Sequence, residues 1–536
     1  EELKMVLTPS PSNSQTYYIG NKKQVSFSLK GESITFTRNF SRKWVVHIPG
    51  ENCYVNGHKI YDGTVLEVGD LLLGYFMEIR LVEEDVLEVA SHTEYETDLS
   101  DIQLPQSEMK KKYPSYRRTP RMVYDLPDDK VSLQFPTQES DDNNKGLWLI
   151  IMPPLIMLIV MGVVALVAPR GIFIIISMVM FMTTLITSTV QFFKEKANRK
   201  RREERRRRVY SLYLENKRRE LQELAEKQTN VLTFHFPSFE RMKYLTGQIS
   251  DRIWERSLES HDFLQFRLGR GKVPSSYEIS INSGDMANRE IDDLLEQSQH
   301  LEKVYREIDH VPVVADLSKG AIGLIGKESV MKNEIHQIIG QLSFFHSYHD
   351  LRFVFIFNEK EYKQWEWVKW LPHFQIPQSF AKGLIYNDQT RDQLLSSIYE
   401  TLRERDLMEE KEKVTFSPHI VFIITEQQLI ADHVILEYLE GDHKDLGISV
   451  IFAADSKESL SDNIETLVRY INTQEGDILI QEKKAVSIPF RLDSHKKEGN
   501  EDFSRMLRTL DHQVGMTNSI PNSISFLEMM KVKEVG

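Results

Sequence analysis

One short stretch carries part of a phosphate-binding loop. Residues 321–328 read AIGLIGKE, so a glycine and a lysine stand where such a loop ends. In a working loop the backbone amides cradle the phosphates, the lysine neutralises them, and the next Ser or Thr holds Mg²⁺. Here Ala321 replaces the first glycine, and Glu328 puts a carboxylate where the hydroxyl belongs. We therefore expect a vestigial phosphate loop, whose residues are Gly323, Gly326 and Lys327.

A second defect lies further along the chain. Residues 420–426 read IVFIITE, which supplies the apolar strand of a Walker B element, but Thr425 stands where the Mg²⁺-linked aspartate belongs. Two losses at independent positions argue against hydrolysis, so we expect no catalytic residue, no metal ion and no cofactor in this chain. The alternatives are residual nucleotide binding and an active NTPase with an atypical site. In the simplest interpretation, Gly323 and Gly326 only turn a strand into a helix.

Three other groups of residues could do chemistry. His346 and His349 are spaced like a metal-binding pair, but no third ligand stands nearby, so we expect surface or capping roles. The tryptophans of WEWVKWLPH (365–373) could stack on bases, yet they have little positive charge around them and favour a core or an interface. The arginines of RLGRG (267–271) could meet an anion, although two solvated side chains in a turn are the commoner outcome.

The elements that would position these residues alternate between strand and helix. Residues 351–357, 420–425 and 448–453 are largely apolar runs, whereas 328–345 and 391–408 are helical in pattern. Apolar strands alternating with helices are typical of a parallel α/β sheet. We therefore predict an α/β, degenerate P-loop-like domain, a pseudo-ATPase, over residues 231–536.

Two long charge-free segments precede this domain. Residues 147–168 and 171–193 each contain no Asp, Glu, Lys or Arg. A helix of about 22 residues rises ~33 Å, enough to cross the ~30 Å hydrocarbon core of a bilayer. The connector is only Pro169 and Arg170, so both flanks must lie on the same side. We predict a two-helix transmembrane hairpin over residues 146–193.

A basic run after the second segment indicates the orientation. Residues 194–208 read KEKANRKRREERRRR, and a second basic stretch lies at 110–121. The positive-inside rule then places both soluble parts in the cytoplasm, so we expect a multi-pass membrane protein. Residues 194–230 lack Gly and Pro and predict a basic helical stalk, with an apolar stripe that either faces solvent or pairs with a second copy.

Composition excludes several classes of protein. The chain has 536 residues, with 41% hydrophobic and 27% charged residues, so most of it should fold as globular domains. Nucleic-acid binding is the rival interpretation of the basic run. The count of 67 Lys plus Arg against 79 Asp plus Glu gives a net charge of −12, which argues against it. Cys53 is the single cysteine, which rules out an internal disulfide and favours a reducing compartment.

The N-terminal part reads as all-β. Residues 1–88 contain short strand-like runs separated by turn signals such as Asn56–Gly57, which suits a tight hairpin. We predict a β-sandwich over 1–88. Residues 89–145 shift between acidic, basic and Pro-rich composition with little apolar periodicity, so we predict an extended linker or strap there.

The sandwich resembles a known family in its second half. The strings YVNGHKI (54–60), LEVGD (66–70) and LGYFMEI (73–79) are similar to those of forkhead-associated (FHA) domains. That resemblance implies phosphothreonine-peptide binding through an Arg after the first Gly and a later Ser-x-x-His. Here Asn21 follows Gly20 and no Ser-x-x-His appears. We therefore expect a docking module without the phosphate grip, with a phosphothreonine-binding signalling receptor as the alternative.

The whole order of segments resembles one family. HDFLQFRLG (261–269), FHSYHDLRFVF (345–355), WVKWLPH (367–373) and PHIVFIITEQQLIADHVILEYL (418–439) are similar to the N-terminal half of EssC/YukB proteins, as is SISFLEMMKVKEV (523–535). These are FtsK/SpoIIIE-type membrane ATPases of the Firmicutes type VII secretion system. The resemblance implies a first FHA domain before Glu1 and intact ATPase domains, with their ATP and Mg²⁺, after Gly536. It also implies that the parent exports WXG100-class proteins.

The expected function follows from these parts. We predict a membrane-anchoring and assembly segment that couples docking at the cytoplasmic face to ATPase domains outside this chain. The expected partners are other type VII secretion membrane subunits, further copies of the same chain, the lipid bilayer, and WXG100-class substrates reached through the downstream domains. No nucleic acid is expected among them.

Overall fold

A computed structural model describes sixteen stretches of the chain, which form two compact units. The first unit comprises Glu1–Val123, Thr233–Lys272 and His310–Gly536, and the second comprises Tyr124–Leu232 and Val273–Asp309. The described residues are 3–8, 16–21, 33–39, 42–47, 53–74, 77–91, 95–101, 115–137, 147–167, 171–281, 293–375, 382–408, 415–441, 444–460, 463–481 and 485–513.

The first unit begins with a sandwich of two antiparallel sheets. One sheet has the order β12-β1-β10-β9-β8-β5-β6 and the other β11-β2-β3-β4-β7. The strands are β1 (Leu3–Thr8), β2 (Thr16–Asn21), β3 (Ser33–Arg38), β4 (Trp44–His47), β5 (Tyr54–Val55), β6 (His58–Lys59), β7 (Thr64–Leu66), β8 (Leu71–Leu73), β9 (Met77–Glu83), β10 (Val86–Ser91), β11 (Tyr95–Thr97) and β12 (Ser100–Asp101).

Apolar side chains from both sheets share one core, as a sandwich requires. Trp44 is 1% exposed and packs its ring 5.9 Å from that of Phe36, while Ile79 and Leu87 contribute from the other sheet. The predicted β-sandwich is therefore confirmed. It extends beyond the predicted boundary at residue 88, because β11 pairs with β2 and β12 pairs with β1 to complete the sheet edges.

The predicted hairpin turn joins β5 and β6. Asn56 and Gly57 both have positive φ, at 50° and 83°, which is the backbone that an Asn-Gly turn favours. Cys53, just before β5, is buried, and burial raises the pKa of its thiol to about 11. The residues that follow Asn21 lie outside the described part, so the absence of a phosphopeptide grip stays a prediction.

A ten-stranded sheet forms the centre of the α/β region, in the order β17-β15-β25-β24-β23-β18-β22-β21-β19-β20. Its bounds are β15 (Gln265–Pro274), β17 (Glu307–Asp316), β18 (Ala321–Gly326), β19 (Leu351–Ile356), β20 (Leu384–Ile385), β21 (His419–Ile424), β22 (Ile448–Ala454), β23 (Ile464–Tyr470), β24 (Glu475–Gln481) and β25 (Ala485–Leu492). The helices are α3 (Phe239–Gly247), α5 (Glu328–Phe345), α6 (Tyr362–Trp365), α7 (Asp388–Asp406), α8 (Leu436–Leu439) and α9 (Asn500–Arg508). Short 3-10 turns lie at Glu359–Glu361, Glu366–Trp370, Pro372–Phe374, Gln427–Ile430, Lys444–Leu446 and Lys457–Ser459.

Six of the ten strands of this sheet pair in parallel, as the apolar runs predict. β23, β18, β22, β21, β19 and β20 pair in parallel, whereas β15, β25 and β24 add antiparallel strands on one side. The predicted helix at 328–345 coincides with α5. The expectation for RLGRG is wrong at Arg267, which lies within β15, is 4% exposed and pairs with Asp493 at 2.6 Å.

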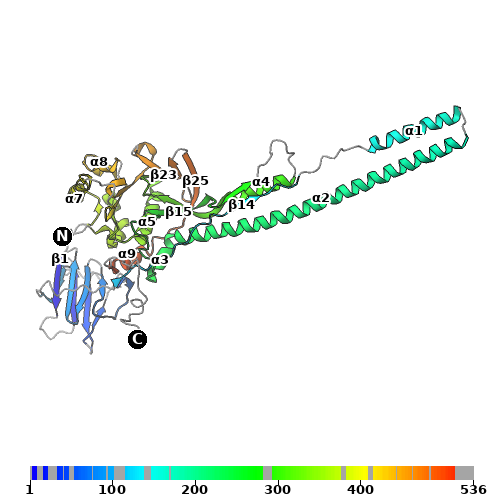
Figure 1. The fold of residues 1–536 in the computed structure, drawn as a ribbon. Coiled ribbons are helices and arrows are strands. Elements are labelled where there is room, and N and C mark those ends of the chain that lie inside the picture. The colour runs from blue at the N-terminus through cyan, green and yellow to red at the C-terminus, as the bar shows by residue number, and fades with distance from the viewer. Residues whose placement is uncertain are drawn as a thin grey trace, which may run out of the picture. The chain divides into compact units, whose positions relative to one another are not determined.

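Helices dominate the second unit. α1 (Leu147–Val167) precedes α2 (Gly171–His235), which is a single unbroken helix of 65 residues (Figure 1). Among the described residues, α2 is long and apolar enough to cross a membrane by length and composition, and α1 contains a shorter apolar stretch, Ile151–Val164. The unit also contains β14 (Lys130–Leu133), β16 (Glu278–Ile281) and α4 (Asp293–Tyr305), and β14 pairs in parallel with β16.

The predicted stalk is not a bare helix. The Tyr210 hydroxyl donates to the Gln134 carbonyl at 2.9 Å, and Arg206 Nε donates to the Thr137 carbonyl at 2.7 Å. Leu221 is fully buried and Leu214 is 8% exposed within this single chain. These two leucines of the apolar stripe are therefore covered within the chain itself.

Candidate functional site

The vestigial phosphate loop is not a loop in the structure. Gly323 lies within β18, Gly326 ends that strand, and Lys327 alone separates it from α5. A Cβ at Gly323 would lie 2.9 Å from side-chain atoms of Ile464 and Leu460, so this position faces packed side chains. Gly326 has a φ of 155°, and a Cβ there would lie 2.8 Å from Tyr470. The two glycines allow close approach of β23 and its neighbours, and no turn of amides is left to cradle phosphates.

The charged residues at the start of α5 pair mainly with one another. Lys327 is exposed, and its side chain makes no capping hydrogen bond to α5. Glu328 pairs with Lys332, which also contacts Glu361 at 2.9 Å. Burial acts to lower the pKa of Lys332, but the hydrogen bonds that its ammonium donates to the two carboxylates raise the pKa overall. Glu328 thus has a cationic partner in the chain and is poorly placed to serve as a metal ligand.

At the Walker B aspartate position, Thr425 is hydrogen bonded to the backbone. Thr425 follows β21, and both its N–H and its hydroxyl donate to the Ile356 carbonyl, at 2.9 and 3.1 Å. β22 lies between β21 and β18 in the sheet. In parallel sheets ligands bind outside the carboxyl ends of the strands. At that edge the Glu328 carboxylate is paired with Lys332 and the Thr425 hydroxyl with a backbone carbonyl, and the loss of nucleotide binding stays a prediction.

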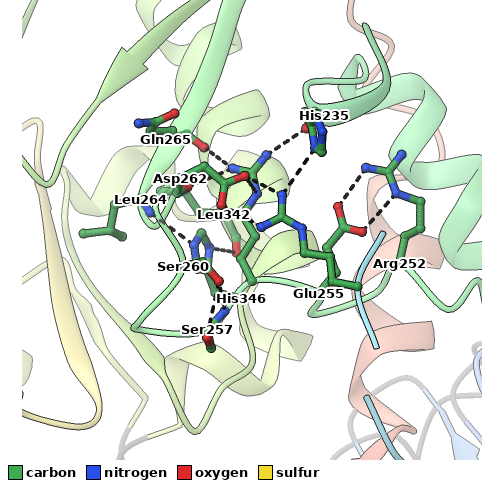
Figure 2. A network of polar contacts seen from close by, with 12 residues as sticks. His235, Arg252, Glu255, Ser257, Ser260, Asp262, Leu264, Gln265, Leu342 and His346 are labelled. Carbon is green, nitrogen blue, oxygen red and sulfur yellow. Dashed lines mark hydrogen bonds and ion pairs between the residues drawn. The ribbon is translucent and has the colours of Figure 1, made fainter. Parts of the chain in front are cut away.

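A buried ionic network lies where α2 ends, and Figure 2 shows it with Asp262 between His235 and His346. Asp262 is 2% exposed and binds two arginines: Arg121 bridges its two oxygens at 2.5 and 2.7 Å, and Arg256 Nε lies 2.9 Å from Oδ2. Burial acts to raise the pKa of the Asp262 carboxyl, but the two guanidinium groups lower it to about 2. The carboxylate is therefore ionised at any physiological pH.

Arg256 links this carboxylate to the end of the long helix. Its guanidinium is fully buried and donates to the His235 carbonyl at 2.8 Å and to the Gln265 carbonyl at 2.8 Å. The guanidinium carbon lies 3.5 Å from the ring centroid of Phe345 at the end of α5. One side chain thus connects the last turn of α2 with β15 and α5, all within the first unit.

The strap enters the same network. Arg121 belongs to the segment that follows β13 (Ser115–Tyr116), and β13 pairs in parallel with β26 (Asp511–His512). The Tyr116 hydroxyl donates to the Ile253 carbonyl at 2.8 Å, and Arg118 pairs with Asp350. The described part of the predicted linker is therefore fixed to its own chain. It holds the segment after the sandwich against the α/β region.

Helix α9 joins the sandwich to the α/β region. The Arg505 guanidinium lies between the rings of Tyr54 and Trp370, at 4.5 and 4.2 Å from their centroids. Tyr54 and Trp370 also share a buried apolar cluster with two leucines of β8. Arg508 pairs with Glu78 of β9 at 3.1 Å. Trp370 is thus an interface residue, as the sequence predicts for its cluster.

The remaining sequence candidates have structural roles. The Leu264 N–H donates to His346 Nε2 at 3.2 Å, and His346 Nδ1 lies 3.0 Å from the Leu342 carbonyl, which leaves no ring nitrogen for a metal. His349 contacts the His512 carbonyl at 3.2 Å. Within the described stretches, no cluster of three or more His, Cys, Asp or Glu side chains could hold a metal ion. Trp365 is 1% exposed and lies 4.1 Å from the His336 ring.

Sequence reasoning missed the network around Asp262. Arg121 and Asp262 are 141 positions apart, and no spacing or motif connects them. The sequence signal was weak: Asp262 directly precedes the apolar pair Phe263–Leu264, and a carboxylate that is buried beside apolar residues must be paired.

A β-sandwich, a long helix that changes from apolar to basic, and an α/β sheet define a multidomain protein with a candidate membrane span. The chain is 60% identical over 551 residues to the ESX secretion system protein YukB of Bacillus subtilis (strain 168). It is 56% identical over 529 residues to EccC of Geobacillus thermodenitrificans and 33% identical over 505 residues to the type VII secretion system protein EssC of Staphylococcus aureus. The alignments cover 100%, 97% and 92% of this chain.

The chain belongs to this family of type VII secretion proteins, which includes YukB, EccC and EssC. It spans 37%, 36% and 34% of the lengths of the three relatives, little more than a third of each. No protein-family model matches it. Among solved structures, the N-terminal FHA domain of EssC overlaps 19% of this chain with 24% identity and a TM-score of 0.16, which is too small an overlap to support an argument.

Proposed function

We propose that this chain is the membrane-anchoring and assembly part of a type VII secretion motor protein. One observation carries the proposal: α2 runs without a break from an apolar segment to His235, whose carbonyl is bound by the buried Arg256 of the α/β region. A continuous helix transmits position and torque better than a flexible linker. The membrane segment and the cytoplasmic region would therefore act as one mechanical part.

The proposed anchor is a two-helix hairpin. α1 and the first third of α2 supply its two apolar segments, and the basic run after the second segment orients both soluble parts towards the cytoplasm. Large exposed apolar side chains support a lipid-facing role, since Val179 and Ile186 are each 59% exposed in the single chain. The protein would thus be multi-pass in the plasma membrane.

The energy for export would come from outside this chain. The residues at the carboxyl edge of the sheet do not form a phosphate cradle, and the relatives are close to three times as long as the chain. We infer that the parent carries active ATPase domains elsewhere and exports WXG100-class substrates. The sandwich and the α/β region would bind other membrane subunits and further copies of the protein and hold them around those ATPase domains.

Two measurements on the purified chain test this proposal. In detergent, calorimetric titration with Mg²⁺-ATP should give no saturable heat, and Lys327→Ala should behave identically. Tight binding that Lys327→Ala abolishes would support the alternative of an atypical NTPase. In cells, the chain should stay with the membrane pellet after alkaline carbonate washing. Release into the supernatant would contradict the anchor.

A further inference from the structure

The basic run after the apolar segment of α2 has two parts with different surroundings. In the second part, Glu203 contacts Arg206 at 3.3 Å and Arg207 at 2.9 Å. These contacts, the hydrogen bond from Arg207 first among them, lower the pKa of the Glu203 carboxyl. Arg206 also binds the strap through the Thr137 carbonyl. This second part therefore stabilises the chain's own structure.

Among the described residues, five cations of the first part have no such partner. We define the basic collar as five exposed residues, and within the described part of the chain no carboxylate pairs with any of them. They are Lys194, Lys196, Lys200, Arg201 and Arg202. The collar begins directly after Phe193, which is 56% exposed, and at ~1.5 Å of rise per residue it ends about 14 Å further along the same helix.

A headgroup layer is about 5–8 Å deep on each side of the hydrocarbon core, so a helix that leaves the core at Phe193 carries about the first turn of the collar through the headgroups. The rest of the collar lies within about one Debye length, ~8 Å, of that layer, where anionic lipids still attract Lys and Arg. Long basic side chains can also reach along the helix to the phosphates while their stems stay on apolar surface. At this depth, unpaired cations are stabilised more by anionic headgroups than by open solvent.

We propose that the basic collar binds the phosphate groups of anionic lipids at the cytoplasmic surface. The inference rests on the proposed function, because it requires α2 to enter the membrane. A nucleic acid offers the same phosphate chemistry, but its backbone would have to lie against the membrane surface. The chain's net charge of −12 also opposes it. The collar is thus a lipid-binding surface, and the paired residues beyond it are not part of that surface.

The test uses matched charge variants of the whole chain in nanodiscs that contain phosphatidylcholine and phosphatidylglycerol. The collar variant changes Lys196, Lys200, Arg201 and Arg202 to Gln, and keeps Lys194 because it borders the apolar segment. The control variant removes the same charge from exposed positions further along α2, namely Arg208, Arg218, Arg219 and Lys227. Spin-labelled lipids of each headgroup type report which lipid occupies the protein's boundary.

We expect the wild-type chain and the control variant to prefer phosphatidylglycerol several-fold, and the collar variant to lose that preference. Added salt should weaken it, because screening acts on exposed charges. The proposal would be overturned if the collar variant preferred phosphatidylglycerol as strongly as the wild type does. It would also be overturned if the control variant lost as much of that preference as the collar variant. A DNA mobility shift that depends on the collar residues would likewise overturn it. Membrane retention is scored separately, so a wild-type chain that is retained without headgroup preference overturns this inference and leaves the anchor intact.

Discussion

At the scale of single residues, the carboxylate of Asp262 connects segments that are distant in the sequence. Its two arginine partners come from the strap and from the segment after α3, and Arg256 adds the last carbonyl of α2. A buried charge is tolerated only where it is paired and hydrogen bonded. Removing one member therefore costs more than the pair itself contributes, because the remaining charges stay buried without compensation.

Replacing Arg256 should destabilise the α/β region strongly. In Arg256→Met the chain keeps a similar side-chain volume, but Asp262 loses one cation and the His235 and Gln265 carbonyls lose their donor. We expect a loss of about 3–5 kcal/mol in the free energy of unfolding, as for other broken buried pairs. Denaturant titration followed by tryptophan fluorescence measures it. Arg270→Met, at an exposed position of β15, is the control and should change stability little; equal effects of both variants would refute the role of the network.

A partly buried histidine predicts a pH dependence. His419 contacts the Ser449 hydroxyl at 2.9 Å, and burial lowers its pKa from 6.5 to about 3. Below pH 6.5 the unfolded chain binds a proton that the folded chain does not, so stability falls as the pH drops towards 3. At pH 5 this amounts to about 2 kcal/mol. His419→Gln should therefore lose less stability between pH 7 and pH 5 than the wild type.

Comparing the two chains isolates that effect. Burial raises the pKa of Glu334 to about 8, so this carboxyl acts in the opposite sense over the same range, but both chains retain it. Denaturation midpoints at the two pH values provide the measurement. Identical pH slopes for wild type and His419→Gln would show that His419 is not buried in its neutral form.

At the scale of elements, α9 acts as an adaptor. It contacts the sandwich through Arg505 and Arg508, and its Phe503 ring lies 5.1 Å from Phe239 of α3. α3 in turn follows α2 after a three-residue connection. A Cβ at Gly57 would lie 2.4 Å from the Met506 Cα, so the sandwich turn and α9 are in close contact. This end of the sandwich is covered by its own chain.

Truncating Arg505 should loosen the sandwich without unfolding it. The guanidinium makes two cation–π contacts and pairs with Glu501 at 2.6 Å, and it is 2% exposed. Desolvated cation–π contacts contribute about 2 kcal/mol each. In Arg505→Ala we expect faster amide exchange in β5, β6 and β8, with protection in β3 and β4 preserved. Arg491→Ala, at an exposed position, is the control, and unchanged exchange in Arg505→Ala would contradict the adaptor role.

At the scale of the whole molecule, the proposed function depends on the continuity of α2. Glu223 is exposed on this helix. A substitution there therefore removes no core packing and acts only through the helix backbone. In the complete parent protein, Glu223→Pro should break the helix at a cost of about 3 kcal/mol, while membrane retention persists. We expect secretion of substrate to fall sharply in Glu223→Pro and to stay normal in Glu223→Ala. Normal secretion with proline would show that the helix need not be continuous.

The sequence by itself determined the elements whose signals are local. The apolar runs, the α5 helix at 328–345, and the Asn56–Gly57 turn were predictable because burial periodicity and backbone preference depend on neighbouring residues. The family was recognisable for the same reason, since long strings of residues carry it.

Only the tertiary structure decided which distant segments meet. Arg505 lies between Tyr54 and Trp370, and Gly323 lies inside a strand, whereas the sequence left open both a phosphate loop and a plain connection from strand to helix. A side chain's partner is set by the packing of whole elements, and no local pattern encodes it. The buried pairing of Asp262 with Arg121 follows from that packing, because the low dielectric of the interior forces a carboxylate to find a cation wherever the fold supplies one.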